Sequence, residues 1–273
     1  MRNIWITAWY TIREALARKV FLFFLGLSAL AIIITAVVVS VLTDSSLIGG
    51  ITAQDNTLLM EEIASSIQLI IITPLASLCI LLAIFSSASF VPNMLEKGNI
   101  DLLLSKPISR SQLLLGKFSG GLLVVFINLA FLIIGIWFVI ALRFTSFNFS
   151  FLSIILSITF TFGVLYSLML LFGVITQGSM LGMMSAYFVY LILSPLLYTG
   201  KTQFDAFITN EFLKSVIDFF YYIIPKSWEL MGEITMNLAL GKGVADWQPV
   251  LTSLAFMIAA LGYAVFIFNK KDF

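Results

Sequence analysis

The sequence predicts an all-α membrane protein with six transmembrane helices, and three observations lead to this fold class. Of the 273 residues, 60% are hydrophobic and 11% are charged, which is more apolar surface than a soluble domain can bury. Six runs contain no Asp, Glu, Lys or Arg, and each is long enough to cross the roughly 30 Å hydrocarbon core of a bilayer. The charged residues between these runs are unequally distributed between the two sides of the membrane. The runs cover residues 20–42, 67–92, 118–142, 150–176, 180–199 and 249–269.

The loop charges predict the orientation, because Lys and Arg are retained on the cytoplasmic side. Six crossings put both termini on one side, which carries ten cations and four acids, whereas the other side carries five cations and ten acids. We therefore expect both termini in the cytoplasm, with the chain in the cell (inner) membrane. Gln177 to Ser179 are interpreted as a tight turn between the fourth and fifth runs. If they continued one long helix, five crossings would result, against the charge rule.

Composition also narrows the classes of function that are open to the protein. The chain has no histidine, one cysteine (Cys79) and a net charge of +1. Histidine-based acid/base chemistry, the common metal sites and an internal disulfide are therefore excluded, and a nucleic-acid partner is not expected. The sequence predicts neither a catalytic site nor a metal site. It favours a protein that moves or holds something in a membrane.

Residues 1–19 are predicted to form an interfacial helix outside the six spans. Ile4, Trp5, Ala8, Trp9, Ile12, Ala15 and Leu16 share one helical stripe. Tryptophans at this spacing favour a helix that lies at the headgroup level of the bilayer. Arg13 and Arg18 lie on its polar face, where they could also contact a cytoplasmic partner.

The outer loop, residues 200–248, is too long for a simple connector and contains no charge-free run that could cross the membrane. It is predicted to form two amphipathic surface helices. Pro225 ends the first, Ser227 opens the second, and Gly241 ends the second. Trp228, Met231, Ile234 and Leu238 are expected on the apolar side of the second helix. The pair is either a lid over the bundle or an outer gate for an exported molecule.

The loop between the second and third runs, residues 93–117, predicts a short helix, a rigid turn and a new helix. Asn99 can cap the short helix, Pro107 prevents its continuation, and Ser109 with Gln112 forms a capping-box pattern that starts the third span. An ordinary basic loop would not require an apolar helix, a Gly/Pro frame and acids among the bases. We favour a coupling segment that carries force from a soluble partner into the membrane.

This loop resembles the permease subunits of type-2 ABC exporters, in which a stretch like Glu96 to Arg110 followed by Leu113 to Lys117 is characteristic. The likeness extends to the whole plan and implies that residues 1–273 form a single transmembrane permease domain. The nearest branch includes permeases linked to copper-enzyme maturation and gliding motility. The resemblance implies two permeases, identical or related, bound to a dimer of cytoplasmic ABC ATPases that hold ATP and Mg. The implied ATPase-coupling residues are Glu96, Gly98, Asn99, Ile100, Asp101, Leu103, Leu104, Lys106, Pro107 and Arg110.

The chain itself has no phosphate-binding loop, because Gly116-Lys117 and Gly241-Lys242 lack the required neighbours. Energy is therefore expected from another subunit, and this chain is predicted to bind no cofactor and to be no enzyme. Two alternatives remain: a membrane scaffold that transmits force without a cargo, and a secondary transporter.

Three further hypotheses concern internal contacts. Glu96 could pair with Arg13 or Arg18 and so fix the amino-terminal helix against the coupling segment. A small-residue stripe, Gly178, Gly182 and Ala186, predicts close helix packing, either within one subunit or at a dimer seam. Pro74 and Pro195 are expected to kink their spans.

Overall fold

The structure is a computed structural model that describes residues 2–17, 19–44, 57–95, 109–144, 147–202 and 211–271. The described residues form helices and connecting turns without a strand, which confirms the all-α class. Six of these helical segments are long and apolar enough to cross a membrane. They are Leu22–Val41, Ser65–Met94, Arg110–Phe144, Phe149–Thr176, Ser179–Thr202 and Gln248–Lys270.

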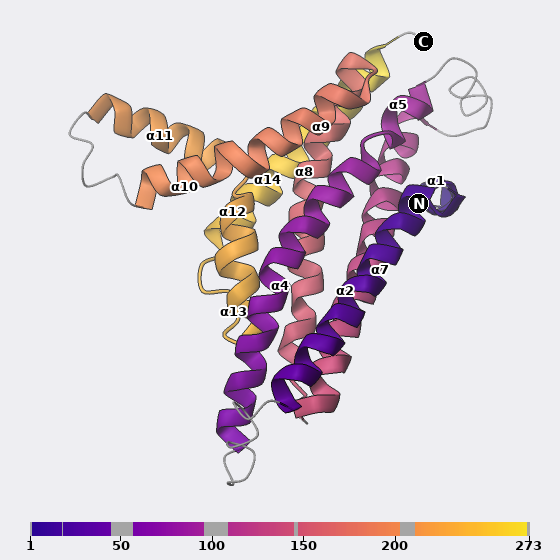
Figure 1. Cartoon of the computed structure of the whole chain (residues 1–273). Helices are drawn as coiled ribbons and strands as arrows, with labels where there is room; N and C mark the ends of the chain where they lie inside the picture. Colours follow the sequence, from indigo (N-terminus) through magenta and orange to yellow (C-terminus); the bar gives the residue numbers. More distant parts are fainter. Residues whose placement is uncertain are drawn as a thin grey trace.

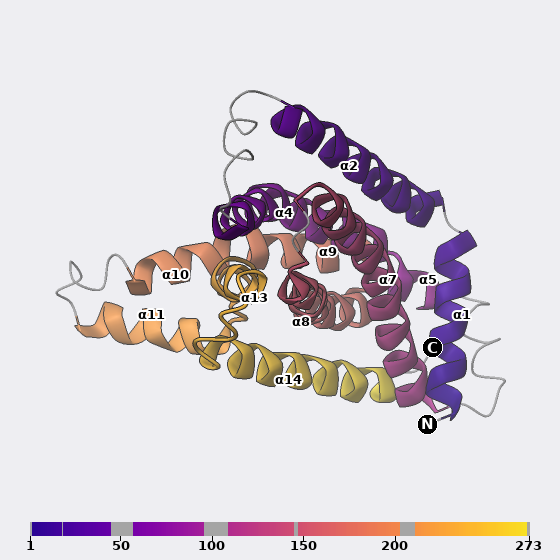
Figure 2. The ribbon, with the colours of Figure 1, turned by 90° about the horizontal axis from the view of Figure 1, so that it is seen from below.

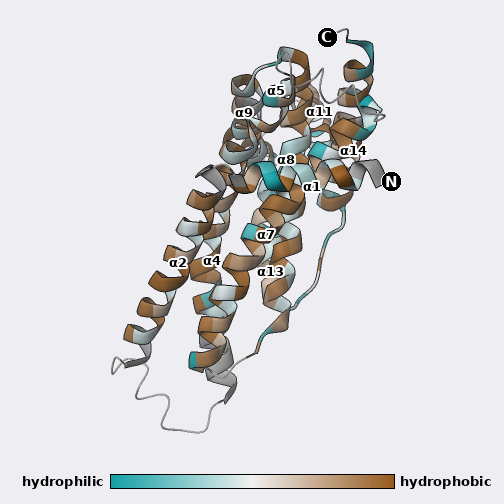
Figure 3. Cartoon of the chain, turned by 90° about the vertical axis from the view of Figure 1, so that its right-hand side faces the viewer, coloured by the Kyte–Doolittle hydropathy of each residue, from teal (hydrophilic) through white to brown (hydrophobic). Residues whose placement is uncertain are grey.

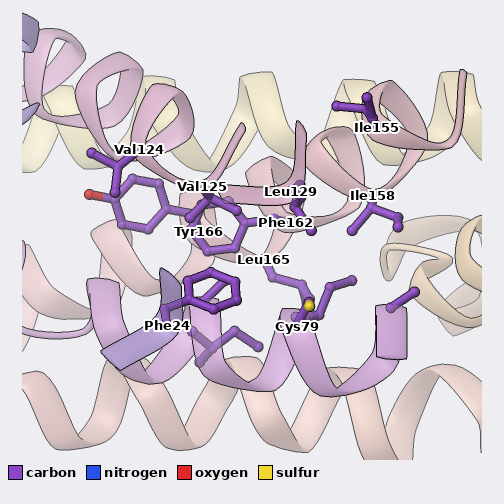
Figure 4. Packing of buried hydrophobic residues seen from close by; sticks show 14 of the residues in the cluster. Phe24, Cys79, Val124, Val125, Leu129, Ile155, Ile158, Phe162, Leu165 and Tyr166 are labelled. Atoms are coloured by element: carbon purple, nitrogen blue, oxygen red, sulfur yellow. The ribbon is translucent and has the colours of Figure 1, made fainter. Parts of the chain in front are cut away.

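Helix α8 (Ile154–Thr176) is the centre of the bundle (Figure 2). Around it lie α4 (Thr57–Ser87), α7 (Arg110–Phe144), α9 (Ser179–Phe188) and α14 (Gln248–Lys270). The position of α8 follows from its sequence, because apolar residues occur on all of its faces and such a helix is stable only when it is surrounded. Its residues Ile158, Phe162 and Leu165 pack with Cys79 and Leu129 in the core (Figure 4).

Helix α2 (Lys19–Asp44) lies at the edge of the bundle, where it packs mainly along α7 (Figure 2). Its outer face exposes large apolar side chains such as Phe23, Ile33 and Val41. Similar exposed apolar side chains cover α7 and α14, and the hydropathy colouring shows apolar residues along the long helices (Figure 3). In a membrane these faces contact lipid.

Helix α1 (Arg2–Ala17) crosses the first part of α7, below α5 (Phe90–Leu95) in the view of Figure 1. Trp5, Trp9 and Leu16 are exposed, as an interfacial helix requires, whereas Ala8 and Ala15 are buried. The predicted stripe is therefore divided between two surroundings. Its small residues face the bundle, and its large ones are left for the headgroup region.

Two predicted turns have the expected geometry. Helix α8 ends at Thr176 and α9 begins at Ser179, with Gln177 in the left-handed region at φ 54°. Gly241 has φ +72°, its N–H donates to the Leu238 carbonyl, and the Lys242 N–H donates to the Asn237 carbonyl. This is a Schellman motif, so Gly241 ends its helix as predicted.

The fifth span bends where a π-helical turn, η2 (Val189–Leu193), precedes α10 (Ser194–Thr202) and its Pro195. Helix α10 then runs beside α11 (Glu211–Ile223), and the two project sideways from the bundle (Figures 1 and 2). The Lys201 ammonium and the Asp218 carboxylate join them at 2.5 Å. Pro74 lies inside α4, and the kink expected there stays a prediction.

The expectation of a second surface helix in the outer loop is wrong. Helix α12 (Ser227–Glu229), the π-turn η3 (Leu230–Ile234) and α13 (Thr235–Ala239) form one segment that packs into the bundle against α8. Ser157 on α8 lies 2.9 Å from the Thr235 hydroxyl. The π-turn adds a residue to the helical repeat, so Leu230, Ile234 and Ala239 are buried while Trp228 is exposed. Ser227 begins this segment, but its hydroxyl makes no cap bond.

Candidate functional site: the junction at the start of α7

Most of the predicted coupling segment lies outside the described residues, which resume at Ser109. The same holds for Arg18, and therefore for the hypothesis that Glu96 pairs with Arg13 or Arg18. Arg13 is described and exposed. The predicted coupling residues outside the described part are Glu96, Gly98, Asn99, Ile100, Asp101, Leu103, Leu104, Lys106 and Pro107.

The two ends of this segment are held by the bundle. Before it, Phe90 and Met94 of α5 are 2% exposed and belong to the core. After it, the Ser109 N–H donates to Gln112 Oε1 at 3.4 Å, and the Gln112 N–H donates to Ser109 Oγ at 3.3 Å. These reciprocal bonds are the predicted capping box and start α7 at Arg110, well before the apolar run.

Arg110 fastens the start of α7 to the end of α14. Its Nη1 donates to the carbonyls of Phe268, Asn269 and Lys271 at 3.4, 3.5 and 2.5 Å. A cation at the end of a helix satisfies carbonyls that have no partner within it and complements the helix dipole. The sequence predicted Arg110 as an ATPase contact. In the structure, Nη1 of its guanidinium donates to carbonyls of the same chain.

Lys271 extends this connection to the central helix. Its Nζ donates to the Val174 and Ile175 carbonyls in the last turn of α8, both at 2.8 Å. Asn269 Nδ2 also donates to Ser111 Oγ at 3.3 Å. The ends of α14 and α8 are therefore joined to the residues with which α7 begins.

A buried ion pair, which the sequence did not predict, joins α1 to α7. Lys117 Nζ lies 2.5 Å from Glu14 Oε2, and the Lys117 side chain is 4% exposed. The Tyr166 hydroxyl of α8 donates to the Lys117 carbonyl at 3.5 Å. The signal was present in the sequence, because Lys117 directly precedes an apolar run and Glu14 is the only acid in α1.

Two glycines permit the close contacts around this pair. A Cβ on Gly120 would lie 2.6 Å from the Thr11 Cβ and 2.9 Å from the Ala8 carbonyl oxygen. A Cβ on Gly121 would meet the Tyr166 ring at 2.6 Å. All three distances are shorter than side-chain contacts allow, so α1 and α8 approach α7 only because these positions have no side chain.

We call Glu14, Arg110, Lys117 and Lys271 the α7 junction. Together they connect α1, α7, α8 and α14, which are labelled in the upper part of Figure 3. Four helices are therefore joined through the side chains of this junction.

The predicted small-residue stripe lies away from the α7 junction, and two of its residues form the contact between α9 and α8. A Cβ on Gly182 would lie 2.9 Å from the Met169 carbonyl oxygen of α8, and Ala186 is fully buried. Gly178 is the residue before α9, and a Cβ there would have no neighbour closer than 3.8 Å. Within this chain, Gly182 and Ala186 therefore pack α9 against α8.

A second polar cluster lies at the junction of α11, α12 and α14. Lys226 and Glu229 are only 3% and 6% exposed. Lys226 Nζ donates to Gln248 Oε1 at 2.5 Å and lies 3.5 Å from the centre of the Tyr221 ring. Burial lowers the pKa of Lys226 to about 8, partly opposed by Glu229 and Asp246, and burial raises the pKa of Glu229.

These features define a polytopic α-helical membrane protein in which four helices meet at the α7 junction. The family model for ABC-2 family transporter protein matches residues 5–273, and the chain belongs to that family. Membership makes it a permease subunit of an ABC transporter, a non-catalytic membrane protein that associates with an ATP-binding subunit. No curated protein matches the chain.

Proposed function

We propose that this permease couples ATP hydrolysis by a separate cytoplasmic ATPase to export, or to conformational work, across the inner membrane. ATP and Mg bind to the partner in this proposal, and this chain binds no cofactor. Two permease copies, identical or related, pair with an ATPase dimer, and both termini of each copy lie in the cytoplasm. We further propose that the chain belongs to the branch that includes copper-enzyme-maturation and gliding-motility permeases.

The observation that carries the proposal is the α7 junction. Residues 96–108 lead directly into a helix that is bonded to α14 through Arg110 and to α1 through Lys117. A push on this segment would therefore move α7 together with its partners instead of bending a free loop. The bistable element is the membrane dimer, which alternates between two arrangements of the bundles.

The positions of the buried charges disfavour a secondary transporter. The buried charged side chains of the described residues are Lys117, Lys226 and Glu229. Lys117 lies in the first turns of α7, and the other two lie between the fifth and sixth spans. Carriers driven by protons or ions usually place ionisable groups within the membrane, where they are costly and functional.

Gentle purification of the tagged full chain tests the proposal. An ABC ATPase should accompany the protein, and its turnover in vesicles should depend on the permease. Leu104→Asp should abolish recovery of the ATPase, whereas Lys242→Gln, an exposed change in the outer loop, should not. Recovery of no ATPase, or recovery unaffected by Leu104→Asp, would contradict the proposal. An ATPase that binds but whose turnover ignores the permease would favour the scaffold alternative.

A further inference from the structure

Helix α1 is buried on one face, where it packs on α7, and exposed on the other (Figure 2). At about 3.6 residues per turn, the exposed residues cover an arc of about 140° around the helix. They are Trp5, Ile6, Trp9, Tyr10, Arg13 and Leu16. Arg13 lies near the middle of this exposed arc, between Trp9 and Ile6. The expectation that Arg13 occupies a polar face apart from the tryptophans is therefore wrong.

Arg13 gives the exposed arc a positive charge that the described part of the chain does not balance. Among the α1 side chains that the structure describes, residues 5–16, Arg13 is the one cation and Glu14 is the one acid. The Glu14 carboxylate is paired with Lys117, whereas Arg13 makes no hydrogen bond or ion pair with the residues that the structure describes. The arc therefore favours an acidic partner, and a guanidinium binds carboxylate and phosphate oxygens particularly well.

The contact with α7 places the exposed arc at the level of the lipid headgroups. Gly120, which α1 approaches closely, is the third residue of the charge-free run 118–142. Lys117, which pairs with α1, directly precedes that run. Helix α1 therefore meets α7 where α7 passes from charged residues into its apolar span, which is the boundary between headgroups and hydrocarbon. Trp5 and Trp9, 63% and 54% exposed, are side chains typical of this boundary.

We propose that Arg13 binds the phosphate of an anionic phospholipid, with Trp5 and Trp9 against the glycerol region of the same lipid. A soluble acidic partner would use the guanidinium alone, whereas a lipid also accounts for the large apolar side chains on both sides of it. An anionic headgroup is favoured over a zwitterionic one, because the zwitterionic headgroup adds a cation that repels Arg13. This site belongs to the permease alone and does not require an ATPase.

Photocrosslinking of the full chain in phosphatidylcholine vesicles tests the site with two tracer lipids. Both tracers carry a diazirine in the acyl chain next to the glycerol. They differ only in the headgroup, which is phosphatidylglycerol in one and phosphatidylcholine in the other. At equal amounts, the phosphatidylglycerol tracer should label residues 5–16 roughly fivefold more, as expected for one cation near an anionic lipid.

Substitutions at Arg13 separate this contact from general attraction to the membrane. Arg13→Gln should make the two tracers label residues 5–16 equally, whereas Arg13→Lys keeps the charge and should keep the preference. Both variants should fold, because Arg13 is exposed. Arg143→Gln, an exposed change at the other end of α7, is the matched control and should leave the ratio unchanged.

Three results would overturn the proposal. The first is equal labelling by the two tracers in the unchanged protein, which pairing of Arg13 with Glu96 would produce. The second is a preference for phosphatidylglycerol that survives Arg13→Gln, because the headgroup would then be recognised by other residues. The third is loss of the preference in Arg13→Lys, since the positive charge is still present there.

Discussion

Lys117 is a cation enclosed by helices, and the ion pair with Glu14 offsets the cost of burying its charge. The Lys117 side chain is 4% exposed, and the Glu14 side chain is 23% exposed. Lys117 Nζ lies 2.5 Å from Glu14 Oε2. Removing one member of such a pair leaves the other charge without compensation, which costs far more than the pair contributes. The pair therefore specifies where α1 lies on α7.

Glu14→Gln should destabilise the protein by about 1–3 kcal/mol, less than for a fully enclosed pair because Glu14 keeps some contact with solvent. Unfolding in detergent should show this loss, and Arg13→Gln, an exposed neighbour, should change little. In Glu14→Gln/Lys117→Met much of the loss should be recovered. Additive effects of the two substitutions would show that the pair is not coupled.

Lys226 should give the stability a measurable pH dependence. Its pKa is about 8 in the folded protein and 10.5 in the reference state, because burial disfavours the charged form. Between these values the unfolded chain binds more protons, so stability should rise with pH, by at most about 1.4 kcal/mol per pH unit. Lys226→Met should remove this slope in chemical unfolding between pH 8 and pH 10. Identical slopes in the two proteins would contradict the assignment.

At the scale of elements, close packing of α1 on α7 depends on Gly120. A methyl group there meets the Ala8 backbone oxygen at 2.9 Å, and backbone cannot rotate away as a flexible side chain can. Helix α1 would have to move outward, which would also lengthen the contact between Glu14 and Lys117.

Gly120→Ala should therefore lower stability by about 1–3 kcal/mol despite the better helix propensity of alanine. Gly262→Ala in α14 is the matched control, since a Cβ there has no neighbour within 4 Å, and it should be neutral or slightly stabilising. Thermal unfolding in detergent distinguishes the two variants. Equal effects at both positions would show that α1 does not need the close approach.

At the scale of the whole molecule, Arg110 makes three of the hydrogen bonds that join the start of α7 to the end of α14. Arg110→Gln should release the last turn of α14, because three carbonyls lose a cationic donor. Hydrogen exchange of residues 266–271 should accelerate severalfold. Arg143→Gln, an exposed change at the other end of α7, should leave this exchange unaltered. Unchanged exchange in Arg110→Gln would contradict this view of the junction.

Orientation in the membrane is also testable. In a Cys79→Ala background, Ser46→Cys should react with an impermeant maleimide added to intact cells, and Asp272→Cys should react only after permeabilisation. This follows from the excess of cations on the side of the termini. The reverse labelling pattern would invert the topology and place residues 96–108 outside the cell.

The sequence alone determined the features that depend on local chemistry. Six apolar runs predicted six membrane-crossing helices, Ser109 and Gln112 predicted the start of α7, and Gly241 predicted the end of α13. Each depends on residues close together in the chain, where helix periodicity and unpaired backbone groups leave few alternatives. The coupling residues from Glu96 to Pro107 stay a prediction from the sequence.

Only the tertiary structure decided which distant residues meet. Glu14 joins Lys117, Arg110 joins the end of α14, and an inserted π-turn brings the segment from Ser227 to Ala239 into the bundle. Periodicity shows that a helix has an apolar face, but in a chain this hydrophobic nearly every face can lie against protein or lipid. The choice is made by steric fit at positions such as Gly120 and by the need of buried charges for partners, and both require the packed helices.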